Sequence, residues 1–236
     1  MAGQQWFEPL VDRGVVPDPL LRLGIRSRLR QQLRDLEREA GGDPDARLRQ
    51  VAAELRRQPI TVHPEAANRQ HYEVPADFFR AFLGPRLKYS SCWWPAGVTG
   101  LAQAEEAMLA LTCERAAIRD GMSVLDLGCG WGSLALYVAE HFPASRVLAV
   151  SNSRSQGEYI RAEAARRGLA NVEHRAGNIA DIEIEETFDR VVSIEMLEHV
   201  RNYEAAFHRI RRWLAPGGRV FVHVLDRKST RLNSSH

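Results

Sequence analysis

The order of apolar and polar residues over 101–225 predicts short strands that alternate with helices. The first predicted strand is a short apolar run, and the predicted helices have apolar residues three or four positions apart. The strands are expected at 124–127, 146–150, 172–175, 188–194 and 219–225. The helices are expected at 101–118, from Ser133 onward and at 203–214. This alternation is typical of an α/β protein with a doubly wound, mostly parallel sheet.

Residues 1–60 form a separate helical region in which leucines recur among arginines. Leu29, Leu33 and Leu36 lie on one helical stripe. A second stripe follows the GGDPD break at 41–45 and contains Leu48, Val51 and Leu55. The pattern predicts two amphipathic helices, packed against the rest of the protein with their arginine faces in solvent. Peripheral contact with an anionic membrane surface is the alternative interpretation.

The segment 123–137, SVLDLGCGWGSLALY, joins the first predicted strand to a helix through three glycines. Gly128, Gly130 and Gly132 suit such a turn because glycine accepts positive φ and lets a ligand approach the backbone. In open α/β sheets, small molecules bind at this end of the strands. The G-x-G-x-G spacing is not that of dinucleotide folds, and no P-loop lysine follows, so a pyrophosphate is disfavoured. Asp126 suits a ligand with a cationic amine.

The glycine segment resembles motif I of the class I S-adenosylmethionine-dependent methyltransferases. Two other segments, HYEVPADFF at 71–79 and LKYSSCWW at 87–94, resemble the cyclopropane fatty-acid synthases of that class. The resemblance covers roughly residues 61–225. It implies a Rossmann-like core at 101–225 that binds S-adenosylmethionine, and a segment at 61–100 that folds over the site as a lid.

The resemblance also implies which residues surround this cofactor. Its methionine end is expected near Asp126, the glycines and the lid residues Tyr89 and Ser90. Polar residues are expected near the ribose, where generic Rossmann sites have a carboxylate that is absent here. Asn178 is expected to hydrogen-bond the adenine edge beside Ile179, with a simple turn residue as the alternative. The predicted set is Tyr89, Ser90, Asp126, Gly128, Gly130, Gly132, Ser151, Asn152, Gln156, Asn178 and Ile179.

The sequence EMLEHV, directly after the fourth predicted strand, supplies candidate catalytic residues at the rim of the site. Glu195, Glu198 and His199 offer two carboxylates and an imidazole for charge stabilisation and proton transfer. Acidic residues also favour the first turn of a helix, so a helix start is the alternative. For cyclopropane synthases the resemblance implies a bicarbonate, held by a cysteine, a Glu-His pair, a fifth-strand histidine and a later tyrosine. His223 matches that histidine.

Two branches of the family differ in the lid sequence. The synthase segment reads Y-S-C, whereas here Ser91 follows Tyr89 and Ser90, and Cys92 comes one position late. The YSSCWW order, the EEAMLALTCERA helix and the EHVRNY segment are more similar to coclaurine-type N-methyltransferases of plant alkaloid pathways. We therefore expect N-methylation of a small, partly aromatic amine. The alternatives are modification of lipid acyl chains at a membrane surface, and a cofactor-binding module without catalysis.

Composition removes several other classes. A formal net charge of +2 is too mild to indicate nucleic-acid binding. Three cysteines without C-x-x-C spacing predict no metal site and no disulfide framework, and they indicate the reduced thiols of a cytoplasmic protein. No apolar run reaches the roughly 18 residues of a membrane span, and the first residues lack the order of a signal peptide.

The final residues, DRKSTRLNSSH at 226–236, break the alternating pattern. Class I methyltransferases carry two more strands after the fifth, for which this sequence leaves no residues. We therefore expect those C-terminal strands to be missing and the final segment to be a non-native tail. A natural short C-terminus is the alternative.

Overall fold

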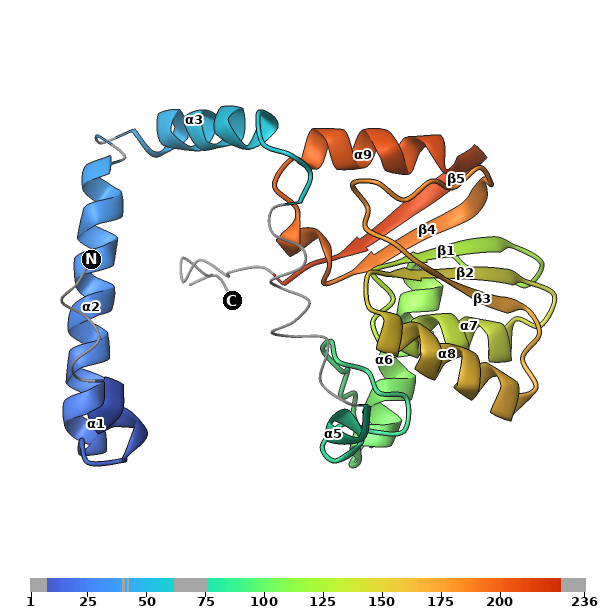
Figure 1. The fold of residues 1–236 in the computed structure, drawn as a ribbon, viewed down its shortest axis with the longest axis horizontal. Coiled ribbons are helices and arrows are strands. Elements are labelled where there is room, and N and C mark those ends of the chain that lie inside the picture. The colour runs from blue at the N-terminus through green and yellow to red at the C-terminus, as the bar shows by residue number, and fades with distance from the viewer. Residues whose placement is uncertain (1–7, 40, 42, 62–75, 226–236) are drawn as a thin grey trace. The chain divides into compact units, whose positions relative to one another are not determined.

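The computed structural model describes residues 8–39, 41, 43–61 and 76–225 (Figure 1). It contains two compact units, which divide after Glu54 and are described separately below. The first residues of the HYEVPADFF segment and the tail predicted at 226–236 lie outside the described residues.

The first unit is helical. Its helices are α1 Glu8–Asp12, α2 Asp18–Glu39 and α3 Pro44–Arg56, the last of which runs across the unit boundary. Asp43 caps α3, because its Oδ1 accepts hydrogen bonds from the backbone amides of Asp45 at 3.0 Å and Ala46 at 2.9 Å. α2 buries none of its residues, and its leucine stripe is about half exposed. Every helix in the described residues falls short of the length or apolar character that a bilayer span needs.

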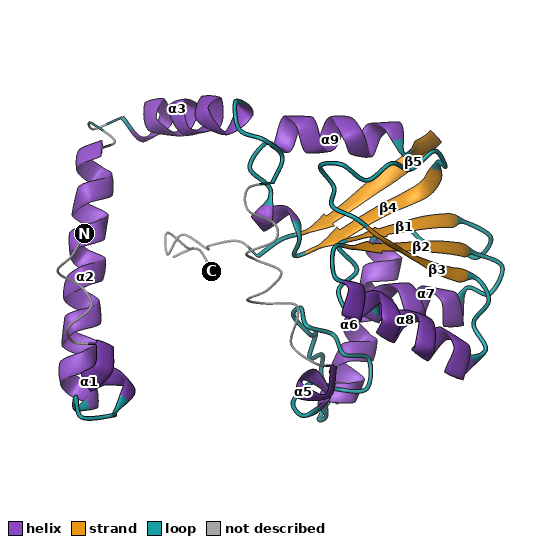
Figure 2. Ribbon diagram, viewed as in Figure 1, coloured by secondary structure: helices purple, strands orange, loops and turns teal. Residues whose placement is uncertain are grey.

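The second unit contains a parallel sheet (Figure 2). Its strands are β1 Ser123–Leu127, β2 Arg146–Ser151, β3 Val172–Ala176, β4 Phe188–Ile194 and β5 Leu214–His223. Their spatial order is β3-β2-β1-β4-β5, and each neighbouring pair is parallel. The chain begins in the middle of the sheet, builds outward to β3, and returns to the other side of β1. This topology confirms the predicted doubly wound α/β fold.

Helices cover both faces of this sheet (Figure 2). The helices of this unit are α5 Ala76–Arg80, α6 Leu101–Arg115, α7 Ser133–His141, α8 Arg154–Arg167, the short 3-10 helix η1 Leu197–His199, and α9 Tyr203–Arg212, of which α5 packs away from the sheet. One apolar core lies between the sheet and α6, α7 and α8, and the other lies under α9. Val124 and Leu125 of β1 face these two cores in turn, so the strand is buried on both sides.

Two predicted boundaries are wrong by several residues. β5 begins at Leu214 and not at Arg219, because Leu214 already pairs with Phe188 before an irregularity in the ladder. The helix expected to reach Ile118 ends at Arg115, since Ala117 adopts a φ of 51° in the left-handed region that terminates helices.

A buried carboxylate on α6 fastens the segment 84–88 to the sheet unit. Glu105 is fully buried, and it accepts hydrogen bonds from three backbone amides of that segment. The donors are Gly84 at 3.1 Å, Arg86 at 2.9 Å and Lys88 at 3.1 Å. A carboxylate that satisfies three amides at once holds the backbone of the segment in one conformation.

Glu105→Gln tests this fastening, because the amide group turns one acceptor into a donor that faces backbone N–H groups. We expect the free energy of unfolding to fall by about 2–4 kcal/mol, the range for losing charged hydrogen bonds and leaving buried amides unsatisfied. Urea unfolding followed by tryptophan fluorescence measures it. Glu106→Gln is the matched control, since Glu106 is half exposed and its ion pair with Arg86 is expected to contribute about 1 kcal/mol or less. Equal losses in both variants would contradict the fastening role.

Candidate active site

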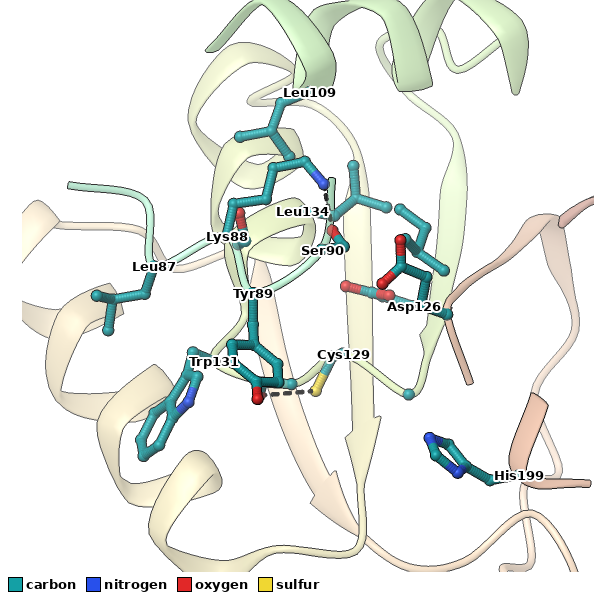
Figure 3. Close-up of a pocket in the computed structure, with 15 residues that line it drawn as sticks. Leu87, Lys88, Tyr89, Ser90, Leu109, Asp126, Cys129, Trp131, Leu134 and His199 are labelled. Atoms are coloured by element: carbon teal, nitrogen blue, oxygen red, sulfur yellow. Dashed lines mark hydrogen bonds between the residues drawn. The ribbon is translucent and has the colours of Figure 1, made fainter. Parts of the chain in front are cut away.

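A cavity of about 200 Å³ lies at the carboxyl ends of β1 and β4, where the order of strands reverses (Figure 3). Ligands of open α/β sheets bind at this switch point. The walls come from the glycine turn after β1, the segment 87–90 and the residues after β4. The predicted site residues that line it are Tyr89, Ser90, Asp126, Gly128, Gly130, Glu195 and His199.

All three glycines of the turn adopt positive φ, but the space around each of them differs. The φ values are 86° at Gly128, 53° at Gly130 and 76° at Gly132. A Cβ at Gly128 would meet Met196 at 2.6 Å, and one at Gly132 would meet Ile160 at 2.6 Å. At Gly130 a Cβ would meet nothing within 4 Å. Gly130 is therefore the glycine whose backbone is open to a ligand in the cavity, whereas Gly132 serves packing at the start of α7.

Asp126 is the buried carboxylate of the cavity. Its side chain is 3% exposed and accepts a hydrogen bond from the backbone amide of Ala135 in α7. Among the described residues, neither Oδ2 of Asp126 nor Oγ of Ser133 has a hydrogen-bond partner. Burial raises the pKa of Asp126 to about 7, although Lys88 acts in the opposite direction. The cavity thus contains polar atoms that a bound ligand would satisfy.

The lid segment contributes one buried residue that sequence reasoning missed. Lys88 lines the cavity with its side chain 3% exposed, and its ammonium donates to Oγ of Ser90. Tyr89 packs edge to face on Phe79, with ring centroids 5.4 Å apart. Phe79 in turn contacts Trp131 of the glycine turn, with centroids 5.1 Å apart. These aromatic contacts hold the lid against the turn.

The rim after β4 supplies Glu195 and His199, which both line the cavity. Glu195 adopts a φ of 50°, which is uncommon for a residue with a side chain. Its backbone N–H donates to the carbonyl of His223 at 2.8 Å, and its Oε1 accepts the backbone N–H of Ser91 at 3.4 Å. Contacts with β5 and with the lid therefore hold this strained residue at the cavity.

The other two predicted catalytic residues, Glu198 and His223, are not among the described residues that line the cavity. Glu198 is exposed, and its carboxylate accepts a hydrogen bond from the backbone amide of Leu225. The part of His223 that reaches the site is its backbone carbonyl, which binds Glu195. Direct catalytic roles for these two side chains remain predictions.

The polar residues predicted near the ribose, Ser151, Asn152 and Gln156, are also not among the described residues that line the cavity. Oγ of Ser151 lies 3.1 Å from Nε2 of His174, and Gln156 is buried in the first turn of α8. Asn152 is exposed after β2. Their contacts with a cofactor stay predictions.

The residues predicted near the adenine, Asn178 and Ile179, lie after β3. Oδ1 of Asn178 accepts the backbone amide of Ala180 at 2.9 Å, which is the turn role considered as the alternative. The side chain of Ile179 is buried in the apolar core under α9. An adenine contact for either residue stays a prediction.

Comparison with known proteins identifies the family. The family described as mycolic acid cyclopropane synthetase matches residues 61–236. The chain belongs to this family. The match confirms the resemblance to cyclopropane synthases that the motifs indicate.

Two N-methyltransferases and one bacterial synthase show where the chain lies within the mycolic acid cyclopropane synthetase family. An (S)-coclaurine N-methyltransferase of Thalictrum flavum subsp. glaucum is 41% identical over 93% of this chain and 61% of that protein. A crystal structure of coclaurine N-methyltransferase bound to N-methylheliamine and SAH gives a TM-score of 0.82 at 40% identity, covering 91% of this chain and 62% of that one. The cyclopropane-fatty-acyl-phospholipid synthase of Escherichia coli (strain K12) is 31% identical over 91% of this chain and 52% of that protein.

Two buried groups make the stability of this unit depend on pH in opposite directions. The pKa of Asp126 is about 7 in the folded protein and near 4 in an unfolded chain. The contribution of Asp126 to the free energy of unfolding is therefore full below about pH 4 and is lost as the pH rises toward 7. Burial lowers the pKa of His174 to about 4, so the contribution of neutral His174 grows between about pH 4 and 6.5.

Asp126→Asn isolates the first of these contributions. We expect the variant to be more stable than the wild type at pH 7.5, by roughly 2–4 kcal/mol, and nearly equal to it at pH 4. Urea unfolding at the two pH values measures the difference, and the His174 contribution cancels because it is common to both proteins. A stability difference that is the same at both pH values would contradict the raised pKa.

Proposed function

We propose that this chain is part of an S-adenosylmethionine-dependent methyltransferase that N-methylates a small amine. The observation that carries the proposal is the buried carboxylate of Asp126 beside the open backbone of Gly130, in a chain 41% identical to an N-methyltransferase. Identity to the bacterial synthase is lower, at 31%, which favours an amine over a lipid acceptor. The chain spans about 61% of that N-methyltransferase, so the proposal concerns the whole protein.

The residues around the cavity fit the methionine end of this cofactor. The ammonium of the ligand would supply the partner that Oδ2 of Asp126 lacks among the described residues. Gly130 leaves room for the ligand to approach the backbone, and Tyr89 and Ser90 border the same cavity. When bound, S-adenosylmethionine supplies a methyl group that its positive sulfonium makes electrophilic.

Glu195 and His199 are the rim residues that would act on the acceptor amine. A carboxylate held beside the nitrogen stabilises the positive charge that the amine acquires when it is methylated. An imidazole accepts a proton near neutral pH, and it thereby keeps the amine in its neutral, nucleophilic form. The backbone of Glu195 is held by its hydrogen bond to His223 and its carboxylate by the amide of Ser91, so the carboxylate is positioned before the acceptor arrives.

Gly130→Leu tests the cofactor site, because the new side chain would enter the open space beside the cavity. We expect at least about tenfold weaker binding of S-adenosylmethionine, since the ligand loses its close approach to the backbone. Isothermal titration calorimetry measures the dissociation constant. Gly168→Leu is the matched control: Gly168 has a φ of 70°, also faces open space, and lies at the end of α8 away from the cavity. Unchanged binding by the Gly130 variant would refute the assigned site.

Glu195→Gln and His199→Ala test the rim with an isoquinoline-type amine as acceptor. We expect each to lower kcat about 100-fold or more, the lower end of general-base effects, and to leave cofactor affinity within about threefold. Glu158→Gln is the matched control and should leave turnover near that of the wild type, because Glu158 is exposed on α8 and is not among the described residues that line the cavity. Turnover near that of the wild type in both rim variants would contradict catalytic roles for Glu195 and His199 and would leave them as residues of a helix start.

The same assay separates the alternative functions. A cyclopropane synthase would require added bicarbonate, would act on acyl chains in phospholipid vesicles, and would lose activity in His223→Ala. A cofactor-binding module without catalysis would bind S-adenosylmethionine and methylate none of the acceptors.

A further inference from the structure

Lys88 is a buried cation to which neither the fold nor the proposed reaction assigns a role. Its side chain reaches from the lid into the cavity, where its ammonium donates to Oγ of Ser90 (Figure 3). Within the described residues it forms no ion pair. Burying an ammonium without a charged partner is strongly unfavourable, and an apolar residue of similar size would pack there at lower cost. A buried lysine in a ligand cavity therefore indicates a ligand that carries negative charge.

The acidic groups that face Lys88 form no ion pair with it among the described residues. Burial lowers the pKa of its ammonium, and Cys92, Glu195, Glu105 and Asp126 only oppose that effect. The carboxylate of Glu105 is occupied by three backbone amides. The carboxyl group of Asp126 has a raised pKa and is therefore partly protonated near neutral pH. Glu195, the remaining carboxylate, accepts the backbone N–H of Ser91, so the Lys88 ammonium still has room for a carboxylate partner from a ligand.

The charged groups of Lys88 and Asp126 together complement one chemical unit. Lys88 offers an ammonium without a carboxylate, and Asp126 offers a carboxylate oxygen without a donor among the described residues. An α-amino acid carries a carboxylate and an ammonium on the same carbon, and S-adenosylmethionine ends in that unit. We infer that Lys88 binds the α-carboxylate of the cofactor while Asp126 binds its α-ammonium, an assignment that rests on the proposed function.

A purely structural role would not need this side chain. Lys88 is fixed to Glu105 through its backbone N–H, at 3.1 Å, and any residue except proline supplies that donor. Lys88→Met keeps the length and the backbone contact and removes only the charge. The variant is expected to fold with a melting temperature equal to or above that of the wild type, because an unpaired buried charge has been removed.

The experiment compares two ligands that differ in one group, S-adenosylmethionine and its decarboxylated form. Calorimetry gives the dissociation constants of both ligands with the wild type and with Lys88→Met. We expect the wild type to prefer the carboxylate-bearing ligand by about tenfold or more, as for a charge-assisted hydrogen bond. In Lys88→Met the preference should fall to within about threefold, entirely through weaker binding of S-adenosylmethionine.

Each other outcome overturns a defined part of the assignment. If Lys88→Met weakens the binding of both ligands equally, or of neither, Lys88 does not bind the carboxylate. If the wild type binds both ligands with equal affinity, no residue of the cavity binds the carboxylate. If the folded wild type binds neither ligand, the proposed function fails, and the assignment of Lys88 fails with it.

Discussion

One buried carboxylate fixes the wall that the lid contributes to the binding cavity. Glu105 projects from α6 and gathers three backbone amides of the segment 84–88, so a stretch without regular secondary structure becomes a fixed wall. That wall presents Lys88, Tyr89 and Ser90 toward the end of β1. Burying a carboxylate is tolerated here because each oxygen is satisfied by backbone donors whose positions the lid cannot easily change.

The sheet supplies the opposite wall through its topology. The order in which strands join the sheet reverses at β1, so the connections after β1 and β4 lead to opposite faces and leave a space at the carboxyl ends of these strands. On one side the glycine turn keeps that space free of side chains at Gly130, and on the other the residues after β4 bring Glu195 and His199 to its rim. The residues proposed to bind the cofactor and those proposed to act on the acceptor thus follow adjacent strands, β1 and β4, of a rigid scaffold.

Local sequence encodes the parts of this protein whose geometry is local. β4 occupies the residues predicted for it, because its apolar residues, Phe188, Val191, Val192 and Ile194, fall within one short segment that is buried as a parallel strand. Asp126 and Gly130 were identifiable because the strand, the turn and the helix that position them are contiguous. The start of β5 was not, since Leu214 continues the helical pattern of α9 and becomes a strand residue only by pairing with Phe188.

Lys88 escaped prediction for a similar reason. A lysine in an irregular segment is ordinarily exposed, and its burial follows from a backbone contact with Glu105 on a different element. The Glu-His pair was predicted as a unit, yet the 3-10 turn of η1 directs His199 to the cavity and leaves Glu198 outside it. Sequence spacing indicates which residues are near a site, but not which way a short turn points them.

The contact between Glu195 and β5 has a consequence for how this family diversifies. The backbone carbonyl of position 223 holds the rim carboxylate, and the imidazole of His223 takes no part in that bond. Every amino acid provides the same carbonyl, so the side chain at this position is released from holding the rim. Evolution could therefore change residue 223 to suit a new acceptor while the strand beneath it continues to hold Glu195. The side chain and the backbone of one residue can in this way serve separate purposes.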